Sequence, residues 1–164
     1  TYKLLLYHLH NIHCNRYDTM SKGKSWHQGL NFDCHQCGHC CTFPGGTVFA
    51  TEKEFQRISE HLNLSFEEFL DTYTDDMDGY VSLISKPEGP CIFYDNGCTI
   101  YETRPTQCRT YPFWNHIVKS PRKWVEEAKT CKGINRGKRW LNKDIKQLLK
   151  NMDQKWMPAR RQSG

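Results

Sequence analysis

The chain has 164 residues, a formal net charge of +5 at pH 7 and 37% hydrophobic residues. This length suits one modest domain rather than a miniature protein that depends wholly on cross-links. No segment approaches the roughly 18 uncharged apolar residues that a membrane span requires, so we expect no membrane span.

The N-terminal segment TYKLLLYHLH contains a leucine run that is too short and too rich in histidine for a secretion signal. We therefore expect a cytoplasmic protein whose thiols stay reduced. Residues 1–29 are expected to be an extension. Because Met20 begins MSKGKSW like an ordinary start, residues 1–19 are either part of that extension or upstream translation.

The segment from about residue 43 to 85 is predicted to form a short strand, two helices and a second strand. The turn in FPGGTVFA precedes strand-forming residues, and YVSLIS alternates like a half-buried strand. Thr51 with Glu54 and Ser65 with Glu68 match the capping-box pattern, and apolar residues follow at helical spacing. The expected helices cover about 51–62 and 65–73, and the second strand covers 80–85.

Two β-prone runs in CIFYDNGCTIY flank an Asp-Asn-Gly turn signal and predict a hairpin with Cys91 and Cys98 at its ends. Pro105 can start a helical turn that Pro112 must stop, which places Cys108 on a short helix.

Two further helices are predicted in the C-terminal part. One runs from Ser120-Pro121 to Gly133 and carries Cys131, and the other is amphipathic and covers about 141–156. The fold class is therefore α+β, a small single domain stabilised by metal. Its expected organisation is the extension 1–29, a cysteine domain 30–135, and a basic amphipathic helix and tail 136–164.

The stretch FDCHQCGHCC places four cysteines within eight positions. Cys34, Cys37 and Cys40 form a C-x2-C-x2-C loop that can turn three sulfurs toward one metal centre, as in bacterial-type ferredoxins. Cys41 follows directly. Because neighbouring side chains diverge on a strand or helix, we expect Cys40 and Cys41 to serve different centres, or one of them to pack.

The chain has nine cysteines, and eight remain when Cys14 in the extension is set aside. Eight thiolates would make two tetrathiolate centres. The later four lack the second close pair of a zinc ribbon, so their partition between centres stays open. The alternative is that some of them are small buried apolar residues. The candidate metal ligands are Cys34, Cys37, Cys40, Cys41, Cys91, Cys98, Cys108 and Cys131.

Other side chains near the cysteines offer further candidates. His35 and His39 could bind zinc or iron, although eight thiols already suffice for two centres. Four thiolates around Zn²⁺ leave a net charge of −2, which the guanidinium groups of Arg104 and Arg109 would stabilise if they are not ordinary surface residues.

Three blocks occur in order: FDCHQCGHCCTFPGG, EGPCIFYDNGCTIYETRPTQCRTYPFW and the segment from Trp124 to the Cys-Lys-Gly-Ile at 131–134. Over about residues 30–135 they resemble the YkgJ-like cysteine-cluster family, described as zinc- or iron-chelating proteins. The resemblance implies that all five cysteines from Cys41 to Cys131 belong to the metal site. One relative, the flagellin lysine N-methylase, is similar in its cysteine block, but no Gly-rich loop of a familiar methyl-donor fold is present here.

Three classes of function follow. The first is a metal-binding protein holding zinc or iron, including an iron–sulfur cluster as the form of the iron. The second is a metal-dependent enzyme for protein lysine methylation or a redox step. No catalytic residue stands out, because the acidic run Asp75, Asp76 and Asp78 is typical of a solvated loop.

The third class is a binder of nucleic acid or of another anionic partner. From Lys119 onward the chain has fourteen Lys and Arg against four Asp and Glu, whereas residues 1–118 have nine against fourteen. Such asymmetry favours an anionic partner at the C-terminal region. Trp124, Trp140 and Trp156 could stack on bases, but their spacing favours a core role.

Overall fold

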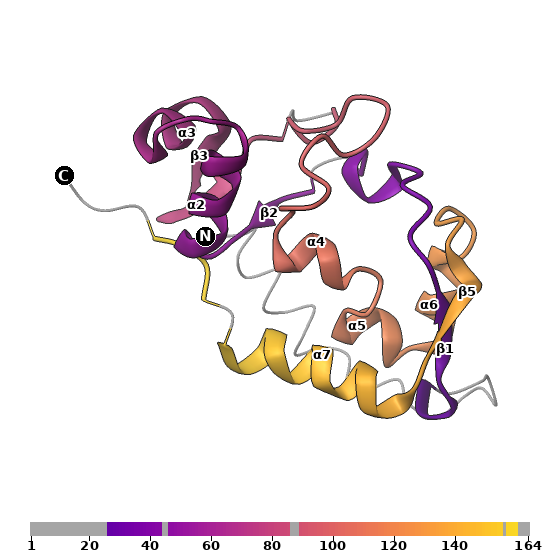
Figure 1. The fold of residues 1–164 in the computed structure, drawn as a ribbon. Helices are drawn as coiled ribbons and strands as arrows, with labels where there is room; N and C mark the ends of the chain where they lie inside the picture. Colours follow the sequence, from indigo (N-terminus) through magenta and orange to yellow (C-terminus); the bar gives the residue numbers. More distant parts are fainter. Residues whose placement is uncertain (1–25, 44–45, 86–88, 156, 161–164) are drawn as a thin grey trace. The chain divides into compact units, whose positions relative to one another are not determined.

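The computed structural model describes residues 26–43, 46–85, 89–155 and 157–160. It has the predicted α+β class, with short helices and two small antiparallel sheets (Figure 1). The chain separates into two units. Of the described residues, the first comprises 26–35 and 112–153, and the second comprises 36–43, 46–85, 89–111, 154–155 and 157–160. Cys14 and the expected extension before Met20 lie outside the described residues, and the predicted boundaries near residues 30 and 135 stay a prediction.

The second unit begins with two helices whose N-termini confirm the predicted capping boxes. Helix α2 covers Glu52–His61 with Thr51 as N-cap, and α3 covers Phe66–Tyr73 with Ser65 as N-cap. A three-stranded antiparallel sheet of order β2-β4-β3 follows from the strands Val48–Phe49, Thr74–Met77 and Tyr80–Leu83, numbered in chain order. In Figure 1, α2 and α3 lie beside β3.

The core of the second unit joins these helices and strands to the loop that carries Cys91 and Cys98. Phe93 and Ile100 of that loop are buried with Phe55 and Phe69 of the helices, and both loop cysteines pack against the same core. The ring of Phe93 stacks on Tyr73 with centroids 5.0 Å apart. The cysteine loop is therefore anchored by apolar contacts. The buried cluster consists of Ala50, Phe55, Ile58, Phe69, Val81, Leu83, Phe93 and Ile100.

The predicted hairpin over residues 91–101 is wrong in its strands. Only isolated bridges form there, between Tyr94 and Cys98 and between Ser85 and Cys91. The physical reason is that local turns use the backbone donors: the amide of Tyr94 donates to Cys91 O at 2.9 Å, and that of Tyr101 to Cys98 O at 3.2 Å. The expected loop at Asp75 and Asp76 is instead part of β3, although both residues are exposed as predicted.

The short helix around Cys108 is confirmed. Helix α4 covers Thr106–Thr110, follows Pro105 as N-cap, and ends at the extended residue Tyr111 before Pro112. The fixed φ of proline suits Pro105 at the start of the helix, whereas Pro112 cannot continue it. Cys108 therefore lies in the middle of a five-residue helix.

The first unit forms around the ring of Phe113. Its centroid lies 4.9 Å from that of Trp140, 6.0 Å from Trp124 and 5.7 Å from Phe32. The Trp140 indole also donates to Phe32 O at 3.0 Å. Trp124 and Trp140 are thus core anchors as expected, although Trp140 ends a strand and so does not have the helical position assumed for it. Trp156 lies outside the described residues.

The elements of the first unit differ in part from the prediction. The strands β1 (Leu30–Phe32) and β5 (Ile134–Trp140) pair antiparallel and were not expected, nor were the short helices η2 (Trp26–Gln28) and α5 (Asn115–Val118). Helix α6 (Pro121–Glu127) starts as predicted but ends six residues before Gly133. Helix α7 (Asn142–Lys155) confirms the C-terminal helix. Within the described part of the chain, every helix is too short or too polar to cross a membrane.

Candidate metal centre

The first cysteine stretch turns at a glycine that lies against the later cysteine loop. Gly38 has φ 76° and leads into the short helix η3 (His39–Cys41). A Cβ at Gly38 would lie 2.3 Å from Cε2 of Tyr94, so the Tyr94 ring rests directly on the glycine. The amide of Cys91 donates to Cys41 O at 2.7 Å. The first cysteine stretch and the loop after residue 90 are therefore held together.

Gly38→Ala is expected to lower the free energy of unfolding by about 1–2 kcal/mol from left-handed backbone strain alone, with a further loss because the Tyr94 ring must move. Gly79→Ala is the matched control, since Gly79 also has a positive φ, 81°, and a Cβ there meets nothing within 4 Å. Chemical denaturation of both variants measures the effect. Equal losses in the two variants would contradict the close packing of Tyr94 on Gly38.

The vicinal cysteines do not diverge as the sequence rule predicts. The sulfurs of Cys40 and Cys41 lie 3.9 Å apart. The reason is the η3 turn, because a 3₁₀-helix rotates successive residues by about 120° rather than about 180°, and staggered rotamers then bring both sulfurs to one side. Two thiolates on one tetrahedral zinc, with Zn–S about 2.3 Å, would lie about 3.8 Å apart. The pair has the spacing of two ligands of one ion.

Cys98 joins this pair through the Cys41 thiol. The hydrogen bond to Cys41 lowers the pKa of Cys40 to about 7 and that of Cys98 to about 6. The same two hydrogen bonds, followed by burial, raise the pKa of Cys41 far above its usual value. The lowered pKa values of Cys40 and Cys98 favour the thiolate, the form that binds metal.

Cys91 and Cys108 lie within electrostatic range of these sulfurs. Burial raises the pKa of Cys91, and negative charge on Cys98 and Cys40 adds to the rise. Burial also raises the pKa of Cys108, again with a contribution from the neighbouring cysteines. Mutual repulsion of this kind is what a bound cation relieves. We call this group the five-cysteine cluster: Cys40, Cys41, Cys91, Cys98 and Cys108.

The two arginines that flank Cys108 in sequence do different things. The guanidinium of Arg104 lies 3.6 Å from the ring centroid of Tyr101 and donates to Tyr101 O, and its charge favours the thiolates by lowering the pKa of Cys40 and Cys98. Arg109 instead lies against Glu54, at 3.7 Å. Of this pair, Arg104 acts on the thiols.

The other candidate ligands stand outside the five-cysteine cluster. Cys37, in the second unit, is exposed; Cys34 and Cys131 belong to the first unit, where Cys34 is exposed and Cys131 is buried. The rings of His39 and Phe43 are perpendicular, with centroids 6.5 Å apart. Whether these residues bind metal stays a prediction.

The cluster has the ligand chemistry of a metal site but not yet its final geometry. Across residues 26–43, 46–85, 89–155 and 157–160, no group of three or more His, Cys, Asp or Glu side chains stands ready to hold a metal ion. The thiols of Cys40 and Cys41 hydrogen-bond to each other instead. Each sulfur moves when its single side-chain torsion changes rotamer.

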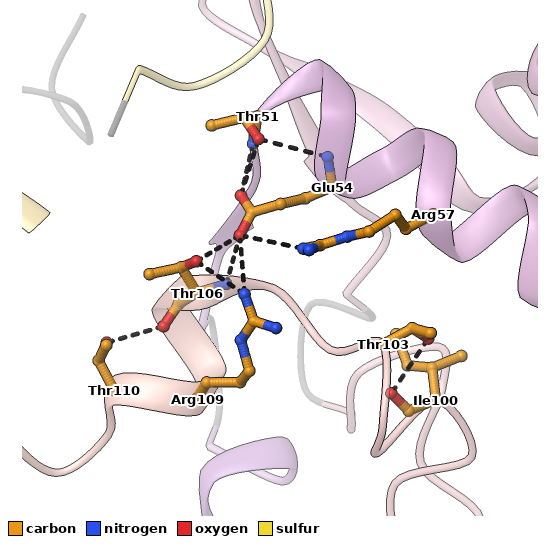
Figure 2. Close-up of polar contacts among 8 residues, drawn as sticks. All are labelled: Thr51, Glu54, Arg57, Ile100, Thr103, Thr106, Arg109 and Thr110. Carbon is orange, nitrogen blue, oxygen red and sulfur yellow. Dashed lines mark hydrogen bonds and ion pairs between the residues drawn. The ribbon is translucent and has the colours of Figure 1, made fainter. Parts of the chain in front are cut away.

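Helix α4, which carries Cys108, is attached to α2 by a buried carboxylate that the sequence did not single out for this purpose (Figure 2). One oxygen of Glu54 accepts from the amide and hydroxyl of Thr51, and the other accepts from the amide of Thr106 at 2.7 Å and from its hydroxyl. Arg57 lies 3.8 Å from the second oxygen. The capping-box motif is the only sequence signal that points to Glu54.

A second buried side chain attaches α4 to strand β2. The Gln107 amide donates to Thr47 O at 2.8 Å and accepts from the amide of Phe49 at 3.0 Å, so it pairs with the strand much as a neighbouring backbone would. Gln107 is only 5% exposed. Cys108 is thus on a helix fixed on two sides.

Burial acts to raise the pKa of Glu54, but the hydrogen bonds from Thr106 and Thr51 outweigh it and leave the pKa below its usual value. The stability that Glu54 contributes is therefore fully present above the unfolded pKa, about 4.3, and is lost as the pH falls through the lower folded pKa. Glu54→Gln is expected to lower the free energy of unfolding by about 1–3 kcal/mol near neutral pH. The difference from wild type should shrink near about pH 3. Denaturation of both proteins at the two pH values measures this, and a difference independent of pH would contradict it.

Comparison with known proteins gives a match over the segment that contains the five-cysteine cluster. A family model described as "CxxCxxCC: putative zinc- or iron-chelating domain" matches residues 33–132. An uncharacterized protein of Methanocaldococcus jannaschii is 36% identical over 88 residues, which are 52% of this chain and 46% of that protein. The matched segment thus spans about half the length of this curated relative. No solved structure matches the chain.

Proposed function

Because the chain belongs to the CxxCxxCC family of zinc- or iron-chelating domains, we propose that it binds zinc or iron at one centre formed by the five-cysteine cluster. The observation that carries this proposal is the 3.9 Å separation of the Cys40 and Cys41 sulfurs; the lowered pKa of Cys98, caused first by Cys41, supports Cys98 as a third ligand. A tetrahedral centre uses four thiolates, so Cys40, Cys41 and Cys98 would be joined by Cys91 or Cys108 as the fourth ligand.

The surroundings of the cluster support a cation. Four thiolates around a divalent ion leave a net charge of −2, and the Arg104 guanidinium is placed to offset part of it. The free thiols of Cys40 and Cys98 are consistent with a reducing compartment, and we propose the cytoplasm. The hypothesis of protein lysine methylation stays a prediction.

The identity of the metal is tested with the full chain prepared without oxygen. Zinc would leave the protein colourless. An iron–sulfur cluster would give an absorption band near about 400 nm, from thiolate and sulfide charge transfer to iron. Cys98→Ser is expected to lose the metal in either case. A Cys98→Ser protein that retains wild-type metal content would overturn the proposed ligand set.

A second candidate function is binding of a nucleic acid, and it rests on the exposed strand β5. Arg136, Lys138 and Arg139 are all exposed, and the Lys138 ammonium lies 4.5 Å from the ring centroid of Trp140. Residues 112–153 carry eleven Lys and Arg against four Asp and Glu, whereas residues 36–111 carry five against twelve. The positive charge is concentrated in one part of the chain, as phosphate binding requires.

The salt dependence of binding tests this candidate with single-stranded RNA and duplex DNA as probes. Replacing Arg136 and Lys138 by Ala is expected to weaken binding and to reduce the slope of log K against log salt by about 0.7–0.9 for each phosphate that the variant no longer neutralises. Lys53→Ala, an exposed change in the acidic part of the chain, is the control. Binding that is equally weak in wild type and the double variant would contradict the candidate.

A further inference from the structure

Glu54 and Glu68 both cap a helix, and Glu54 also binds a second helix, α4. Glu68 caps α3 through Ser65, with one oxygen accepting from the Ser65 amide at 3.0 Å and hydroxyl at 2.7 Å. Glu54 caps α2 through Thr51 in the same way. Glu68 is exposed, whereas Glu54 is 5% exposed. The two glutamates therefore differ in what the second carboxylate oxygen of Glu54 binds.

That second oxygen binds the first residue of α4. It accepts from both the amide and the hydroxyl of Thr106 and lies 3.7 Å from Arg109, so donors from both sides of Cys108 converge on it. Figure 2 shows the Thr106 hydroxyl and the Arg109 guanidinium turned toward the Glu54 carboxylate. The carboxylate therefore fixes the N-terminus of α4 and one of its faces.

Helix α4 needs such a fixation because it is only five residues long. Isolated helices of that length do not form, since nucleation costs more than one turn returns. The position of the Cys108 sulfur thus depends on what holds the helix, which is Glu54 at its N-terminus and Gln107 against β2. The direction in which the Cys108 side chain points therefore changes when the helix tilts or rotates.

We propose that Glu54 is a positioning residue for the metal centre: its carboxylate holds α4 so that Cys108 points into the five-cysteine cluster. The inference rests on the proposed function, because it assumes metal binding by the cluster. Glu54 and Glu68 both cap a helix, and Glu54 in addition positions a metal ligand. The orientation of Cys108 then depends on the hydroxyl of Thr106.

The test measures alkylation of each cysteine by a maleimide, with peptide mass spectrometry, in the full-length protein loaded with Zn²⁺ and again after removal of the zinc. In wild type, zinc should protect all of the cluster cysteines that bind it. In Glu54→Gln and Thr106→Val, the affinity for zinc should fall about 10–100-fold, the range for residues that orient a metal ligand, and at saturating zinc Cys108 should be alkylated faster than in wild type while Cys40, Cys41 and Cys98 stay protected.

Two matched variants separate positioning from general stability. Glu68→Gln removes a capping carboxylate without touching α4, and Thr106→Ser keeps the hydroxyl that Thr106→Val removes. Both are expected to protect Cys108 as wild type does.

Three results would overturn the inference. They are unchanged protection of Cys108 in Glu54→Gln and Thr106→Val, loss of protection at all cluster cysteines together in these variants, and an equal effect of Glu68→Gln. If zinc protects no cysteine in wild type, the proposed function itself fails, and the role of Glu54 fails with it. That outcome is distinguishable because it is already seen before any substitution.

Discussion

Removal of the metal is expected to unfold the cysteine-bearing segments of the second unit, residues 36–43 and 91–108. These segments form turns, isolated bridges and one five-residue helix rather than extended ladders. Structural zinc in small domains contributes an apparent binding free energy of about 10–16 kcal/mol. The free energy of unfolding of a whole domain is of the same size, about 5–15 kcal/mol. Loss of the metal should therefore outweigh the remaining interactions of these segments.

The aromatic packing of the second unit provides the measurement. The stack of Tyr73 on Phe93 and the ring of Tyr94 on Gly38 depend on the position of the cysteine loop, so near-UV circular dichroism should decrease strongly on chelation. Far-UV dichroism should decrease less, because α2 and α3 keep their capping boxes. A chelated protein that retains its near-UV spectrum and thermal midpoint would contradict the structural role of the metal.

Cys40→Ser and Cys41→Ser are each expected to abolish the same metal centre. Their sulfurs are 3.9 Å apart, which is a ligand-to-ligand distance on one ion. Changes of residues that only orient ligands already cost about 10–100-fold in metal affinity, so loss of a ligand should cost more than that. Metal titration with competing chelators measures the affinity of each variant.

The double variant Cys40→Ser/Cys41→Ser distinguishes one centre from two. With one centre, the double variant loses no more metal per chain than either single variant, because the effects on a shared site are not additive. With separate centres, each single variant keeps one metal and the double variant keeps none. The second pattern would restore the partition that the divergence of vicinal side chains predicts from sequence.

Local signals in the sequence predicted much of the second unit. The starts of α2 and α3 were predicted from the pairs Thr51 with Glu54 and Ser65 with Glu68, because a capping box is a motif of four consecutive residues. Pro105 and Pro112 bounded α4 for a similarly local reason. Candidate ligands followed from cysteine spacing, and the family resemblance is confirmed over residues 33–132.

Features that depend on distant residues were not predictable. The hydrogen bond between Glu54 and Thr106 joins residues 52 positions apart, and the local sequence around either residue does not predict it. Strands β1 and β5 pair across about a hundred residues, and β1 has only three residues, too few for their alternation to predict a strand. The hairpin expected near Cys91 failed because turn hydrogen bonds and the burial of Phe93 and Ile100 outweighed β-propensity.

The most direct test of a single metal centre in the five-cysteine cluster is elemental analysis of the full chain, purified without oxygen, together with its absorption spectrum. The account predicts one centre per chain: about one zinc without a visible band, or iron with sulfide and a band near about 400 nm. It also predicts that this metal disappears in Cys98→Ser. Two separable centres in wild type, or a wild-type protein that takes up neither zinc nor iron, would contradict it.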